Sequence, residues 1–110
     1  MEINDIYIDV QDALKRVANN MDLYKKLLTQ FTGGNHINPI EEALNTKAMK
    51  TAADAVHTLK GIAANLSLKK LAEVTSTLEL DIKNGVDHSK SLAELKQIYY
   101  VTSEQIAEII

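Results

Sequence analysis

A histidine, a lysine and a glycine lie little more than one helical turn apart, at His57, Lys60 and Gly61. On a helical wheel of about 100° per residue, the apolar residues between Ala48 and Leu66 share one broad arc. The opposite side carries His57 together with Lys50, Ala53, Asp54, Lys60, Gly61 and Ala64. Glycine inside a helix costs roughly 0.5–1 kcal/mol relative to alanine, so the open position beside the imidazole suggests a purpose. An exposed imidazole flanked by an ammonium suits a nucleophile that carries a phosphoryl group, because the ammonium neutralises part of the charge.

A carboxylate on the following helix is the expected partner of His57. The helices that carry residues 57 and 79 are joined by a tight turn, so they should pack antiparallel. Equal counting from that turn places Ser76 near His57 and Glu79 about one turn further, within reach of a glutamate side chain. A carboxylate that accepts from Nδ1–H would fix the imidazole tautomer and leave Nε2 as the nucleophile. The alternative is that Glu79 is an ordinary solvated helix residue.

The remaining histidines, His36 and His88, lie in predicted loops among polar neighbours. Neither shows metal-ligand spacing with His57, and we expect both to be incidental. The chain has no glycine-rich phosphate loop, nucleotide-binding glycine box or readable catalytic triad. The sequence therefore predicts no ATP site and no bound metal or cofactor.

The run Ala55–Leu66, AVHTLKGIAANL, followed by Leu71-Ala72 and Leu78-Glu79, resembles the histidine-containing phosphotransfer (HPt) domain of multistep two-component signalling. His-x-Leu-Lys-Gly is the central motif of that family. Residues 8–16 and 23–31 are similar to its opening helices, so the resemblance covers nearly the whole chain.

The resemblance implies a phosphorelay intermediate. Such a domain would accept a phosphoryl group on His57 from the aspartate of a receiver domain and pass it to another receiver. Mg²⁺ would come with the acidic pocket of the receiver, and this chain would need no cofactor of its own. Family members often have Glu or Gln beside the active imidazole, which supports the assignment of Glu79. The chain departs from the family at Ser67, where Gly is usual.

Several contexts and rival functions stay open. The domain could be free-standing or the phosphotransfer end of a hybrid sensor histidine kinase, and residues 8–16 look more like the hybrid-kinase module. Chemotaxis kinases share His-Thr-Leu-Lys-Gly, but an ATP-binding domain would follow there, and we do not expect that context. A different class is a non-catalytic helical protein-interaction module with an incidental His57. A carboxylate-bridged metal bundle is disfavoured, because the chain lacks the Glu-x-x-His pattern.

Length and composition limit the class of protein. A chain of 110 residues predicts a single domain over residues 1–110. The hydrophobic fraction is 45%, and with four Tyr and one Phe the core should be mainly aliphatic. The absence of cysteine excludes disulfides and fits a cytoplasmic protein. A net charge of −3 with interspersed bases argues against nucleic-acid binding, and no apolar run reaches the ~20 residues of a membrane helix. Partner receivers and oligomeric state are left open.

Helical periodicity runs through the chain and no segment alternates as a strand would. We therefore predict an all-α fold, an antiparallel four-helix bundle with short N-terminal helices. The bundle helices should cover about 21–33, 46–65, 68–84 and 89–110, and a short helix should cover 38–45. Residues 1–8 should pack Ile3, Ile6 and Ile8 on the bundle. Local caps are expected from Asp9, Asn38, Thr46, Ser67 and the Ser91–Glu94 capping box, with Asn84-Gly85 as a helix end.

Overall fold

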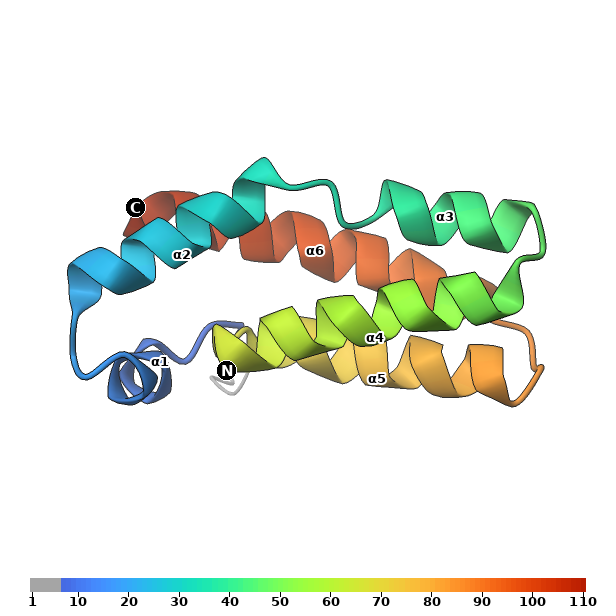
Figure 1. Ribbon diagram of the computed structural model, residues 1–110, viewed down its shortest axis with the longest axis horizontal. Helices are drawn as coiled ribbons and strands as arrows, with labels where there is room; N and C mark the ends of the chain where they lie inside the picture. The colour runs from blue at the N-terminus through green and yellow to red at the C-terminus, as the bar shows by residue number, and fades with distance from the viewer. Residues whose placement is uncertain (1–6) are drawn as a thin grey trace, which may run out of the picture.

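The computed structural model describes residues 7–110, which form six α-helices and no strand beyond an isolated bridge between Ile8 and Leu68. Figure 1 shows their arrangement. The helices are α1 (Val10–Arg16), α2 (Met21–Gly33), α3 (Asn38–Asn45), α4 (Met49–Asn65), α5 (Lys69–Lys83) and α6 (Ser89–Ile109). The expected all-α fold is confirmed. Ile3 and Ile6 lie outside the described residues, and no helix within 7–110 is long and apolar enough to cross a membrane.

Three positions of the bundle are filled by the long helices α4, α5 and α6, and the fourth is filled by the two shorter helices α2 and α3 in succession. α4 packs against α5, α5 packs against α6, and α3 packs against α4. In Figure 1, α2 and α3 follow each other along the same side of the molecule as α6. The helix expected over residues 21–33 therefore fills only part of the fourth position of the bundle, and α3 fills the rest. The break between them falls at Gly33-Gly34, where α2 ends as predicted.

The core is aliphatic, as the composition predicted. Fully buried side chains come from α2, α3, α4, α5 and α6, and each such residue contributes roughly 1.5–3 kcal/mol; they include Leu28, Ile40, Leu59, Leu71, Leu78, Leu95 and Ile106. Tyr24 is also fully buried, and its hydroxyl donates to the Leu66 carbonyl at 2.8 Å. This hydrogen bond ties α2 to the end of α4. Burial raises the pKa of Tyr24 to about 12.

The predicted caps divide into local ones that form and others that do not. Asp9 accepts from the Asp12 amide at 3.1 Å, and the Asn84-Gly85 helix end is present, with Gly85 at φ +67°. Thr46 does not cap α4, which begins at Met49; its hydroxyl instead donates back to the Glu42 carbonyl.

Two more predicted caps are wrong. Asn38 lies inside the first turn of α3, and its backbone N–H donates to the side-chain oxygen of Asn35. Ser91 forms no capping box, because α6 begins at Ser89 and the Ser91 hydroxyl donates to Asp81 Oδ2 at 2.7 Å. In each case a hydrogen bond with a residue outside the predicted motif, Asn35 or Asp81, forms in place of the predicted cap.

Ser67 does not cap α5 either, and its role is in the turn that joins α4 to α5. Its backbone has φ +58°, a left-handed conformation that costs most residues about 1–2 kcal/mol and glycine little. The buried Ser67 hydroxyl donates to Asp12 Oδ2 at 2.7 Å, and its carbonyl accepts from the Asp9 amide at 2.9 Å. The position where the related family usually has Gly is thus a left-handed one, held here by two contacts with the α1 segment.

Ser67 variants are expected to separate backbone strain from the hydrogen bond. Ser67→Ala keeps the strain and loses the bond, so it should unfold at lower urea than the wild type. Ser67→Gly also loses the bond but relieves the strain, and should be more stable than Ser67→Ala by about 1 kcal/mol. Urea denaturation measures this difference, and equal stability of the two variants would show that Ser67 is unstrained.

The same contact predicts a pH dependence. The Ser67 hydrogen bond is the largest cause that lowers the pKa of Asp12 from 3.8 to about 2, with Lys69 adding to it. Because the folded pKa lies below the unfolded one, this carboxylate stabilises the fold above pH 3.8, and the contribution is lost as pH falls toward about 2. Ser67→Ala should lose less stability than the wild type across this interval in urea denaturation.

Candidate functional site

His57 lies on the outer face of α4, as the helical wheel predicted. Its side chain is 66% exposed, whereas the opposite face of the helix is buried against α3 and α5 through Ala52, Val56, Leu59 and Ala63. Ala53 was expected beside His57 on the solvent side but is buried. The face that carries the imidazole is therefore narrower than predicted.

Glu79 of α5 contacts His57 directly. Its Oε2 lies 3.0 Å from His57 Nδ1, and its side chain is only 7% exposed. The counting argument placed Ser76 near His57 and Glu79 within reach one turn further, and Glu79 accepts the hydrogen bond; α5 starts at Lys69, one residue later than expected. An ionised carboxylate can only accept, so Nδ1 carries the hydrogen in this contact and Nε2 keeps its lone pair.

Two lysines complete the surroundings of the Glu79 carboxylate. Lys60 Nζ lies 3.3 Å from Oε1, and Lys83 Nζ lies 3.0 Å from Oε2, the same oxygen that His57 Nδ1 contacts. Lys60 was expected near His57. Lys83 was missed, although the Glu79–Lys83 spacing of four residues on one helix is a recognisable ion-pair signal.

The charge state of Glu79 follows from these neighbours. Burial by itself would raise the pKa of Glu79, but hydrogen bonds from Lys83, Lys60 and His57 together hold that pKa below its ordinary value of 4.5. The carboxylate is therefore ionised at neutral pH. Its contribution to stability is present above 4.5 and is lost as pH falls below that value.

Gly61 lies in open space one turn after His57. A Cβ built at Gly61 meets no atom within 4 Å, apart from its own helix backbone and chain neighbours. Packing against another helix therefore does not require glycine here. The bare position leaves room next to the imidazole for an incoming group.

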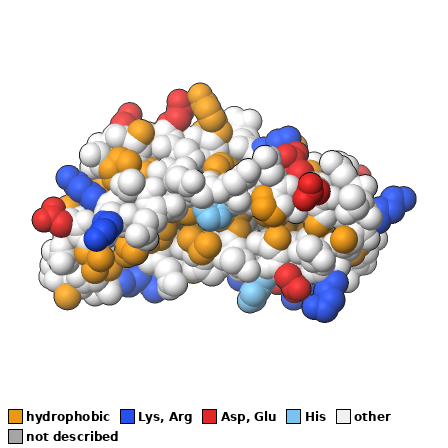
Figure 2. Space-filling view, turned by 45° about the horizontal axis from the view of Figure 1, so that its top comes forward, with side chains coloured by type: hydrophobic (Ala, Val, Ile, Leu, Met, Phe, Trp, Pro, Cys, Tyr) orange, Lys and Arg blue, Asp and Glu red, His pale blue; other side chains and the backbone are white. Residues whose placement is uncertain are grey.

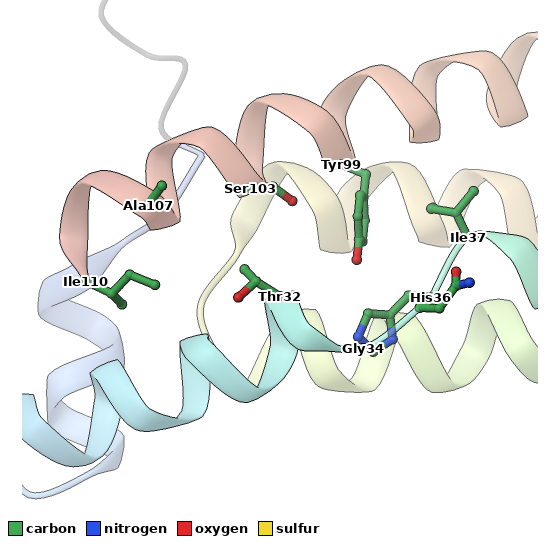
Figure 3. Close-up of a pocket in the computed structure, with 9 residues that line it drawn as sticks. Thr32, Gly34, His36, Ile37, Tyr99, Ser103, Ala107 and Ile110 are labelled. Carbon is green, nitrogen blue, oxygen red and sulfur yellow. The ribbon is translucent and has the colours of Figure 1, made fainter.

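The other two histidines lie in connections between helices. His36 stacks on Phe31 with ring centres 4.7 Å apart, and its Nε2 lies 3.0 Å from the Phe31 carbonyl. Its ring also lies against that of Tyr99 on α6, with ring centres 6.2 Å apart, and both residues line a hollow of about 350 Å³ (Figure 3). His88 precedes α6 and is half-buried. The contacts with Phe31 give His36 a structural role. That His36 and His88 take no part in phosphoryl chemistry stays a prediction.

A partly apolar surface lies at the end of α4 that follows the site. A groove of about 640 Å³ lies between α2 and the end of α4, and Ile62 and Leu66 line it together with Leu27 and Phe31. Figure 2 shows hydrophobic side chains in a broken band along one face of the molecule, with charged groups near its margins and histidine side chains reaching the surface. Mixed apolar and charged surface of this kind suits contact with another protein.

Glu79 variants should show whether its oxygen or its charge matters to His57. Glu79→Gln keeps an acceptor for Nδ1–H, so the reactivity of His57 toward phosphoramidate should stay close to wild type. Glu79→Ala removes the acceptor and should slow the reaction about tenfold or more, since the tautomer and ring orientation are no longer fixed. Intact-mass spectrometry over time measures both rates. Equal rates for Ala and Gln would rule out the orienting role.

A comparison with known protein families gives one match. Residues 26–107 match the family model described as the Hpt domain. No curated protein and no solved structure gives a significant match to the chain. The matched range contains His57, Lys60, Gly61, Glu79 and Lys83, and runs through most of the described helices. The chain therefore belongs to the Hpt domain family, whose general role is histidine phosphotransfer in phosphorelays.

Proposed function

We propose that His57 is the phosphoryl acceptor of this Hpt domain, that receiver domains in the cytoplasm are its partners, and that it passes the group from one receiver to another. The observation that carries the proposal is the pairing of an exposed imidazole with a buried carboxylate. Glu79 accepts from Nδ1–H at 3.0 Å, so that in the neutral imidazole the lone pair is on Nε2, on a side chain that is 66% exposed.

The transfer step needs no proton to move. The Nε2 lone pair of His57 attacks the phosphorus of the receiver's aspartyl phosphate, so that an N–P bond forms while the P–O bond to the aspartate breaks. The bonding electron pair leaves on the aspartate oxygen as a carboxylate. Nδ1 keeps its hydrogen, which faces Glu79, and the phosphorylated ring is an imidazolium next to a carboxylate. Onward transfer to a second receiver is the reverse of this step.

The roles of the neighbours follow from their positions. Glu79 orients the ring, and Lys60, one turn after His57 on α4, neutralises charge on the phosphoryl group. Gly61 keeps the approach open. Mg²⁺ belongs to the acidic pocket of the receiver, and this chain supplies the nucleophile, the charge partner and the contact surface.

The direct test uses purified receiver domains phosphorylated with acetyl phosphate in the presence of Mg²⁺. Mixing them with this domain should move phosphate onto the domain, and intact-mass spectrometry at neutral pH should detect it. The modification should be labile in acid, as an N–P bond is. Phosphoramidate, a small donor, tests the histidine without a receiver. If neither donor modifies the domain, the alternative of a non-catalytic helical interaction module becomes the better account.

A further inference from the structure

Glu79 has more hydrogen-bond partners than a ring-orienting carboxylate needs. His57 Nδ1 and Lys83 Nζ both lie 3.0 Å from Oε2, and Lys60 Nζ lies 3.3 Å from Oε1. Orientation of the imidazole requires only the first contact. The two ammonium groups therefore call for a separate explanation.

A nearly buried carboxylate needs a counter-ion that stays in place. Removing the last cation from a buried carboxylate leaves an uncompensated charge, which is strongly unfavourable. When a phosphoryl group reaches Nε2, its negative oxygens compete with Glu79 for the ammonium of Lys60, which is on the same helix as His57. While the N–P bond is still forming, the ring does not yet carry its full positive charge, so Lys60 can leave Glu79 at that stage only if another cation holds the carboxylate.

We propose that Lys83 is a positioning residue that remains on Glu79 as its permanent counter-ion and so frees Lys60 for the phosphoryl group. The proposal rests on the proposed function of His57. Lys83 reaches Glu79 from one turn further along α5, and it bonds the oxygen that orients the ring. Lys60 bonds the other oxygen, at 3.3 Å against 3.0 Å for Lys83, so it can swing outward without disturbing the oxygen that contacts Nδ1.

The proposal makes an unusual prediction about single variants. Lys60→Ala removes the cation that meets the phosphoryl group, and should slow phosphorylation of His57 by phosphoramidate roughly three- to tenfold, the effect of one partly screened charge contact. Lys83→Ala should slow it to a similar extent, because Lys60 is then retained by Glu79. Lys83→Arg keeps the charge and should stay close to wild type. Lys96→Ala, which breaks the exposed 2.8 Å pair with Glu41 on another face, is the matched control and should change nothing.

Combination with Glu79→Gln separates this role from the others. A neutral glutamine needs no counter-ion, so Glu79→Gln/Lys83→Ala should regain the rate of Glu79→Gln alone. Glu79→Gln/Lys60→Ala should stay slow, because the contact with the phosphoryl group is still missing. A purely structural role of Lys83, or a direct contact with phosphate, predicts no such selective rescue.

The phosphorus signal gives a second readout. The ³¹P chemical shift of phosphorylated Lys83→Ala should match that of Lys60→Ala, and should return toward wild type in Glu79→Gln/Lys83→Ala. Wild-type rates for Lys83→Ala, or an unrescued double variant, would overturn the inference while leaving His57 as the acceptor. A wild-type domain that neither phosphoramidate nor a phosphorylated receiver modifies would instead overturn the proposed function itself. Thermal unfolding followed by circular dichroism checks that every variant is folded.

Discussion

His57→Gln is expected to fold as the wild type does and to lose phosphorylation completely. The His57 side chain is 66% exposed, and within residues 7–110 its hydrogen-bond partner is the Glu79 carboxylate. A glutamine can therefore replace it without leaving a cavity. Intact-mass spectrometry after incubation with phosphorylated receivers and with phosphoramidate measures the loss, and circular dichroism checks the fold.

Matched histidine variants make this result specific. His88→Gln should be phosphorylated at the wild-type rate, because His88 is in the connection between α5 and α6. His36→Gln should also be phosphorylated, although loss of its stacking on Phe31 should lower the unfolding temperature slightly. Acid-labile phosphate retained on His57→Gln and lost on one of these variants would move the acceptor to that histidine.

Much of the site could be predicted because it lies on one helix. A helical wheel needs only the sequence, and it places His57, Lys60 and Gly61 on the outer face of α4, where the structure has them. The contact with Glu79 depends on the register between two helices. Counting from the turn placed Glu79 within reach of His57, and the structure has this contact at 3.0 Å; the sequence alone left open the alternative of a solvated Glu79.

Two of the failed caps, those of Ser67 and Ser91, have a common physical origin. Sequence patterns identify partners a few residues away, whereas Ser67 bonds Asp12, 55 residues earlier in the chain, and Ser91 bonds Asp81 on the preceding helix. Both hydroxyls were predicted to cap their own helices, and both found carboxylates brought near by the packing. Lys83 was visible as an i,i+4 partner of Glu79, but its relation to His57 required the antiparallel packing of α4 and α5.

Gly61→Gln is expected to keep or raise the melting temperature while sharply reducing transfer from a receiver. The substitution meets no atom within 4 Å at Cβ, and glutamine is a better helix former than glycine, which favours the folded state by up to roughly 1 kcal/mol. The same side chain would stand beside the imidazole. Since the receiver's aspartate must approach Nε2 in near-in-line geometry, and an error of about 1 Å can cost about 10²-fold in rate, we expect a loss of that order.

Two comparisons show that the loss comes from a blocked approach. Phosphoramidate needs far less room than a receiver, so its reaction with Gly61→Gln should be much less affected. Gly33→Gln places the same side chain at the end of α2, also in open space, and should leave transfer unchanged. If Gly61→Gln unfolds the domain, the conclusion that a side chain at position 61 meets open space is wrong. If it transfers phosphate from receivers at the wild-type rate, the receiver reaches His57 from a direction that Gly61 does not border, and the glycine must be explained by something other than access.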